Sequence, residues 1–142
     1  MGEFCNRNNI KTVIFTNGIL LYKYIHLLND NFNLLININK LNENNKKLLL
    51  KSLDMCNTLK WFLTNQVTLG CNLYSLNNDY SYFWEIVDRY KEIKQVRMSI
   101  TAPVMNEDKK DKFLYYNKMK PILLSFLKEA EKRNLKISYD CN

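Results

Sequence analysis

The chain has 142 residues, a formal net charge of +7 and 46% hydrophobic residues. This length fits one domain, or part of a larger one, with a real buried core. No apolar run approaches the roughly 18 residues that a membrane-spanning helix needs, and Met1 is not followed by a basic and then apolar leader, so we expect a cytoplasmic protein with no membrane partner.

The positive charge is spread along the chain rather than clustered. Lysines and arginines are mixed with acids in segments 88–92 and 128–133. Such mixing is typical of solvated helix faces, whereas phosphate-binding surfaces gather their cations together. We therefore do not expect a nucleic-acid partner.

The cysteines are far apart in the sequence. Cys5, Cys56, Cys71 and Cys141 form no Cys-x-x-Cys pair, and the chain has a single histidine. This spacing predicts reduced, mostly buried thiols and no metal site built from this chain alone.

The first 41 residues predict an irregular start followed by a strand, a helix and a strand. Residues 1–9 show no periodicity, and a β-branched run predicts a strand over 11–16 that ends at Asn17 and Gly18, a pair suited to a tight turn. One face of the next helix carries Leu20, Leu21, Tyr24, Leu27 and Leu28. A second strand is predicted over 33–39.

The middle of the chain repeats this unit. Asn42 and Glu43 can open a helix whose apolar stripe is Leu49, Leu53, Cys56, Leu59 and Leu63. A third strand follows over 67–74. Asp79 is a suitable N-cap for a helix with Phe83, Val87 and Tyr90 on one side, and a fourth strand is predicted over 95–101.

The last unit has a long helix after residues 106–108 and a fifth strand over 135–140. Pro121 lies inside that helix and should kink or divide it. About five strands alternating with four helices predict an α/β fold over 10–142, with a parallel sheet, because a helix between two strands returns the chain to the same end.

Alternation along the strands predicts two different faces for this sheet. One face is apolar and should meet the helices; it carries Val13, Phe15, Leu34, Ile36, Leu69, Val96, Met98 and Ile137, among others. The opposite face is polar and includes Thr12, Ile14, Thr16, Asn33 and Thr68. A doubly wound sheet would be apolar on both faces, so we expect a partial TIM-like (β/α) barrel with a polar interior.

Ligands of parallel β/α folds bind at the carboxyl ends of the strands. The candidate residues at those ends are Thr16, Asn17, Asn37, Asn39, Asn72, Tyr74, Arg97, Ser99, Thr101 and Asp140. Most are amides and hydroxyls, which donate and accept hydrogen bonds but are poor acids, bases or metal ligands. The site therefore binds and orients, and a reactive group should come from a cofactor. For Arg97, a role toward the ligand and a salt bridge within the sheet are both open, and any single Asn could serve a turn or cap.

The order of four short motifs resembles the later strands of the radical S-adenosylmethionine superfamily. The motifs are Thr16-Asn17-Gly18, Leu35-Ile36-Asn37-Ile38-Asn39, Leu69-Gly70-Cys71-Asn72 and Val96-Arg97-Met98-Ser99-Ile100-Thr101-Ala102-Pro103. The resemblance implies an enzyme that binds S-adenosylmethionine at a [4Fe-4S] cluster and cleaves it to a 5′-deoxyadenosyl radical, which takes hydrogen from a small-molecule or peptide substrate.

The resemblance also implies roles for individual residues. It places the cofactor at Thr16, Asn17, Gly18, Asn37, Asn39, Asn72 and Arg97, and the substrate near Tyr74, Ser99, Thr101 and Asp140. The family's Cys-x3-Cys-x2-Cys motif is absent from this chain. We therefore expect an N-terminally incomplete piece, inactive alone, whose cluster ligands lie upstream and whose partner is the missing barrel strands or another subunit. The alternative is a non-catalytic parallel α/β domain that binds a ligand or a protein.

Overall fold

The computed structural model describes residues 2–29, 31–73, 79–100 and 109–140. Its centre is a five-stranded sheet in which every neighbouring pair is parallel and the strands follow one another in sequence order. The strands are β1 (Thr12–Thr16), β2 (Phe32–Asn37), β3 (Val67–Leu73), β4 (Gln95–Ile100) and β5 (Lys136–Asp140). The predicted parallel α/β fold is confirmed, with small differences at the strand ends.

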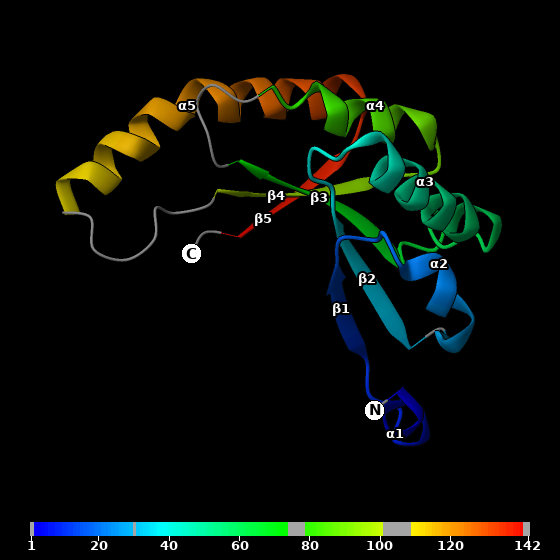
Figure 1. Ribbon diagram of the computed structural model, residues 1–142. Helices are drawn as coiled ribbons and strands as arrows, with labels where there is room; N and C mark the ends of the chain where they lie inside the picture. Colours follow the sequence, from blue (N-terminus) through cyan, green and yellow to red (C-terminus); the bar gives the residue numbers. More distant parts are fainter. Residues whose placement is uncertain (1, 30, 74–78, 101–108, 141–142) are drawn as a thin grey trace.

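All connecting helices lie on the same side of this sheet. They are α2 (Leu21–Tyr24) with the 3-10 turn η1 (Ile25–Leu27), α3 (Glu43–Thr58), α4 (Ser81–Arg89) and α5 (Lys109–Lys132). Figure 1 shows α2 to α5 gathered over one face, while no described element covers the other, which we call the open face. Sequential parallel strands with helices on one side only are the arrangement of a partial β/α barrel.

The core fills the space between the helices and the sheet. Leu34, Ile36, Leu69 and Val96 from the strands are almost fully buried there. From the helices and loops come Leu49, Leu53, Cys56, Phe62 and Phe83. The helix-facing residues of the four strands β2 to β5 were assigned correctly from alternation, because a strand covered by helices needs an apolar side chain at every second position.

Local signals fix where α3 and α4 begin. The Asn42 side chain accepts a hydrogen bond from the Asn45 N–H at 2.9 Å, as a helix N-cap does. The Asp79 carboxylate accepts one from the Ser81 N–H, also at 2.9 Å, although the capping position itself is Tyr80. Both polar residues therefore start a helix by satisfying a free backbone donor.

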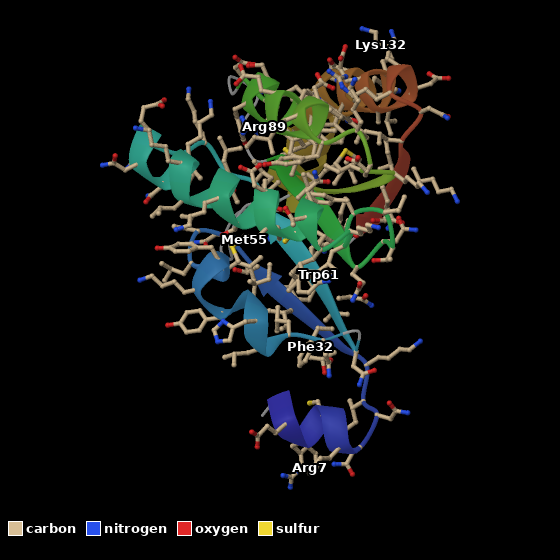
Figure 2. The ribbon with its side chains drawn as sticks, turned by 90° about the vertical axis from the view of Figure 1, so that its right-hand side faces the viewer. Arg7, Phe32, Met55, Trp61, Arg89 and Lys132 are labelled. Carbon is tan, nitrogen blue, oxygen red and sulfur yellow. The ribbon has the colours of Figure 1, made fainter. Side chains whose placement is uncertain are left out.

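Two helical details differ from the sequence-based expectation, and the course of α5 excludes one of its two alternatives. Residues 2–7 form a short helix, α1 (Gly2–Arg7), where no regular element was predicted; it stands apart from α2 to α5 in Figures 1 and 2. The long helix α5 runs through Pro121 without being divided. After α3 ends at Thr58, Leu59 and Leu63 are exposed, because the positive φ of Lys60 breaks the helical periodicity.

The predicted apolar face of the first connecting helix is only partly right: Leu21 is buried and Leu28 packs against the core, but its other members do not. Leu20, Tyr24 and Leu27 are exposed, whereas Leu21 and Ile25 are buried. The helix α2 has only four residues before it tightens into the 3-10 turn. A change from 3.6 to about 3 residues per turn rotates later side chains away from the face that regular spacing predicts.

The side-chain directions of β1 are the reverse of those predicted. Phe15 pairs with Leu35 and Val13 with Asn33, which puts both β1 residues on the open face. They are 63% and 54% exposed. Ile14 packs against the core instead. Residues 13 to 15 are all apolar, so alternation does not decide whether the odd or the even positions of β1 face the helices.

Candidate functional site

The strand register brings most of the predicted polar residues together on the open face. Paired residues of a parallel sheet point to the same side, and positions two apart along a strand share that side. One row runs from the end of β2 across the middle of β3, β4 and β5 and consists of Asn37, Gly70, Arg97 and Ser138. The next row, nearer the carboxyl ends, is Asn72, Ser99 and Asp140. Asn37, Asn72, Arg97 and Ser99 thus share one face, as predicted, although Arg97 lies at the middle of β4 and not at its carboxyl end. Of Asp140, only the backbone position beside Ser99 is described.

Asn37 lies across Gly70. A Cβ atom added to Gly70 would be 2.5 Å from Asn37 Oδ1, so the amide occupies the space that the glycine leaves. This oxygen is buried and has no hydrogen-bond partner within the described part of the chain. A buried amide oxygen without a partner is costly, and such an atom is a natural acceptor for a polar ligand.

Asn72 and Ser99 form the next row toward the carboxyl ends. The Ser99 hydroxyl donates a hydrogen bond to Asn72 Oδ1, and both side chains are half-buried. This bond uses the carbonyl of the Asn72 amide, so its NH₂ group remains the donor that this side chain can offer. The pair can therefore present a fixed hydrogen-bond donor on the open face.

Arg97 reaches across the sheet toward β1. Its Cζ atom lies 5.6 Å from the centre of the Phe15 ring, although two strands separate β4 from β1. A guanidinium over an aromatic face is attracted by the ring, and its N–H groups point outward in the guanidinium plane. The Arg97 guanidinium thus lies over the open face, close to β1.

The Thr16-Asn17-Gly18 segment makes its hydrogen bonds within its own turn. Thr16 Oγ1 accepts from the Gly18 N–H and Asn17 Oδ1 from the Ile19 N–H, each at 3.1 Å. Gly18 has a φ of +75°, and a Cβ there would lie 2.6 Å from Leu49 Cδ1. Glycine is required by the backbone and by packing, so the motif has a structural role.

The other predicted positions contribute less to the described site. Thr16 faces the helices, since it pairs with Ile36, and Asn39 is exposed beyond the end of β2. Tyr74 and Thr101 lie outside the described residues. The structure therefore concentrates the predicted site on β2, β3 and β4.

Nothing in the described segments is arranged to hold a metal ion or cluster. No three His, Cys, Asp or Glu side chains come together in those segments. Burial raises the pKa of Cys56 and of Cys71 to about 12, so both thiols stay protonated near neutral pH. These buried residues do not fit an iron-sulfur cluster, whereas the polar row on the open face fits a polar organic ligand.

A second feature of the open face lies toward the amino ends of the strands. A hollow of about 380 Å³, which we call the strand hollow, is lined by Val13, Phe15, Asn33, Leu34, Leu35, Asn65, Thr68, Gln95, Arg97 and Ser138. Sequence reasoning missed Val13 and Phe15 as site residues because it placed them under the helices. The polar alternation of β3 to β5 was the signal that this face is not covered by helices.

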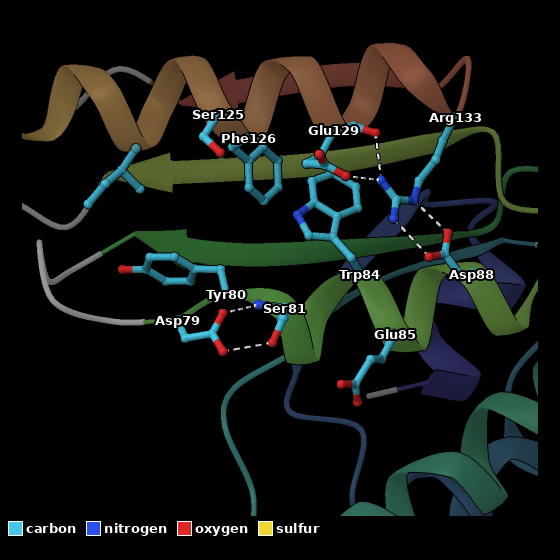
Figure 3. Close-up of a pocket in the computed structure, with 11 residues that line it drawn as sticks. Asp79, Tyr80, Ser81, Trp84, Glu85, Asp88, Ser125, Phe126, Glu129 and Arg133 are labelled. Carbon is cyan, nitrogen blue, oxygen red and sulfur yellow. Dashed lines mark hydrogen bonds and ion pairs between the residues drawn. The ribbon is translucent and has the colours of Figure 1, made fainter.

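A larger groove of about 540 Å³ lies outside the sheet between α4 and α5, and Figure 3 shows its lining. Arg133 bridges the two helices there: its Nη2 donates to Asp88 Oδ2 at 2.8 Å and its Nη1 to Glu129 Oε2 at 2.7 Å. Its Cζ lies 4.6 Å from the Trp84 ring. These contacts join helix to helix, so we assign the groove a structural role.

The described helices include none that is long and apolar enough to cross a membrane. No family model matches the sequence, and no curated protein matches it. Among solved structures, the chain is similar to the crystal structure of Streptococcus suis SuiB, with 16% sequence identity and a TM-score of 0.47. The alignment covers 99% of this chain and 35% of the SuiB chain, so this chain spans about a third of that neighbour's length.

Proposed function

We propose that this chain is part of a radical S-adenosylmethionine enzyme and contributes the later barrel strands that bind S-adenosylmethionine and substrate. The observation that supports this function best is that Asn37, Asn72 and Ser99 share the open face at or next to the carboxyl ends of parallel strands, with Arg97 in the row of Asn37. Sites of β/α barrels are built at that end.

In the proposed enzyme, the chain's residues bind and position. The partnerless Asn37 Oδ1 accepts a hydrogen bond from a hydroxyl or amino group of S-adenosylmethionine, and Asn72 donates one. When bound at its cluster, this cofactor supplies the radical that removes hydrogen from a substrate. The cluster ligands belong to residues outside the described segments, because the described cysteines do not fit them.

The same proposal includes a cytoplasmic location. Cys5, Cys56 and Cys71 are free thiols, which a reducing compartment such as the cytoplasm maintains. The substrate is a small molecule or a peptide, and the barrel is completed by preceding strands or by another subunit.

The experiment has two arms. Anaerobic iron-sulfide reconstitution of an extended protein with upstream sequence should give an iron-sulfur charge-transfer band and S-adenosylmethionine cleavage. In the 142-residue chain, calorimetric titration with S-adenosylmethionine should show binding that Asn37→Ala weakens about tenfold, as expected for the loss of one hydrogen bond. Asn117→Ala, which removes an exposed amide from α5, is the matched control. Equal binding by wild type and Asn37→Ala would exclude this site.

The second candidate is a non-catalytic domain that binds a ligand or protein through the open face. The exposure of Phe15 and Val13 on that face favours it, because exposed neighbouring apolar side chains mark interaction surfaces. Two results together would support this candidate over the enzyme: the extended protein forms no cluster, and the 142-residue chain still binds a ligand at the open face.

A further inference from the structure

We propose that the strand hollow binds a carboxylate that carries an apolar, aromatic-sized group. Its volume of about 380 Å³ falls in the range of roughly 300–1,000 Å³ typical of small-ligand sites. The hollow lies on the same face as the proposed cofactor residues but nearer the amino ends of the strands. The inference names the substrate class of the enzyme proposed above and to that extent rests on that function.

The charge of the lining points to an anion. In the described part of the chain, the strand hollow is lined by one cation, Arg97, and by no aspartate or glutamate. The outer groove differs, since four acids line it. A carboxylate entering the strand hollow therefore meets a favourable field.

The geometry of Arg97 suits a carboxylate. Its Cζ lies 5.6 Å from the centre of the Phe15 ring, so the guanidinium reaches into the hollow as far as β1. A guanidinium carries five N–H donors, so the side chain can donate to a carboxylate while keeping its ring contact and other interactions. The Thr68 and Ser138 hydroxyls and the Gln95 amide line the same hollow and can complete the carboxylate's hydrogen bonds.

The opposite wall of the hollow is apolar. Val13 and Phe15 are more than half exposed, and Leu35 lies between them and β3. An apolar group of the ligand would cover these side chains and remove their surface from water. The hollow thus offers one ligand both the Arg97 guanidinium and the apolar side chains of β1 and β2.

The test is a titration of the isotope-labelled 142-residue chain with 3-phenylpropanoate, followed by two-dimensional NMR. We expect saturable shifts at the backbone amides of Phe15, Thr68, Arg97 and Ser138. The neutral isostere 3-phenylpropanamide should bind at least about tenfold more weakly, since it lacks the charge-assisted hydrogen bonds. Equal affinity for acid and amide, or shifts confined to α4 and α5, would overturn the inference.

Variants assign the effect to Arg97. Arg97→Gln should lose at least about tenfold in affinity for the acid and little for the amide, and Arg97→Lys should fall between wild type and Arg97→Gln. Lys128→Gln, which removes an equal charge from the exposed surface of α5, should bind like wild type. Unchanged binding by Arg97→Gln would refute the assignment, and if that variant does not fold, the acid and amide comparison on wild type decides.

Failure of this proposal is distinguishable from failure of the proposed function. A protein that forms a cluster and cleaves S-adenosylmethionine but does not discriminate the acid from the amide would overturn this inference alone. If the 142-residue chain binds 3-phenylpropanoate in the strand hollow but the extended protein forms no cluster, only the proposed enzyme function would be overturned.

Discussion

The contact between Gly70 and Asn37 allows a quantitative test of the candidate site. A Cβ atom at position 70 would meet Asn37 Oδ1 at 2.5 Å, while its other neighbours, Asn37 Cγ and Leu35 Cδ1, stay at an ordinary 3.7 Å. Gly70→Ala therefore conflicts with one atom only. In the wild-type background the crowding should cost about 1–3 kcal/mol. This is offset by about 0.4–1 kcal/mol, because alanine restricts the unfolded chain.

The double variant separates these two effects. Once Asn37→Ala has removed the amide, Gly70→Ala should stabilise the chain by about 0.4–1 kcal/mol. The coupling energy between the two positions should then be about 1–3 kcal/mol. Urea unfolding followed by the fluorescence of Trp61 and Trp84, which are both buried, measures each free energy of unfolding.

Asn33 provides the control for this cycle. It lies on the same strand and the same face as Asn37, but at the other end of β2. Asn33→Ala combined with Gly70→Ala should therefore be additive. A coupling between Asn37 and Gly70 below about 0.5 kcal/mol, which is the usual error of additivity, would show that the amide does not lie across the glycine.

Three other substitutions test the fold around the site. Gly18→Ala should destabilise the chain by about 2–4 kcal/mol in urea unfolding, because φ is +75° and the new Cβ would lie within 2.8 Å of two core side chains. Ser52→Ala should cost about 1–2 kcal/mol and speed amide exchange at Tyr22, whose N–H donates to the buried Ser52 hydroxyl at 2.9 Å. The Arg133 guanidinium holds the pKa of Asp88 below its usual range, so this pair stabilises the chain near neutral pH and is lost as the pH falls through that lowered pKa. The urea midpoint of Arg133→Gln should therefore fall less than that of wild type between about pH 7 and about pH 3.

The sheet could be predicted because the strands β3 to β5 alternate between an apolar face and a polar face, and β2 does so except at Leu35. Leu69 and Cys71, for example, are buried under the helices, while Thr68 and Asn72 are half-buried on the open face. The helical segments between the strands then require parallel pairing. These signals are local, so one sequence is enough to reveal them.

The direction of β1 could not be predicted by the same reasoning. Val13, Ile14 and Phe15 make both faces of this strand apolar. Which face meets the helices therefore depends on what packs beside the strand. Ile14 fits against the core, and Phe15 is left over the open face, within 5.6 Å of Arg97. A contact that spans the width of two intervening strands depends on sheet curvature, and curvature leaves no signal in local periodicity.

The Thr16-Asn17-Gly18 turn marks a different limit. Its residue types suit either a ligand or a tight turn, and their side-chain acceptors bind the backbone N–H groups of Gly18 and Ile19. Sequence reasoning could place the turn at the carboxyl end of β1. It could not show that these acceptors would already be used within the turn, because that depends on the detailed course of the backbone.

The corrected direction of β1 gives the open face two chemically different halves. One half lies toward the carboxyl ends of β2, β3 and β4 and presents the amides of Asn37 and Asn72 and the hydroxyl of Ser99. The other half lies toward β1 and presents Phe15. Arg97 stands in the row of Asn37 yet extends toward Phe15, so it lies at the boundary. A uniformly polar face would offer one kind of site. A divided face can hold a polar cofactor and an apolar acid side by side, so binding of one should leave room for the other, and competition between them would contradict this division.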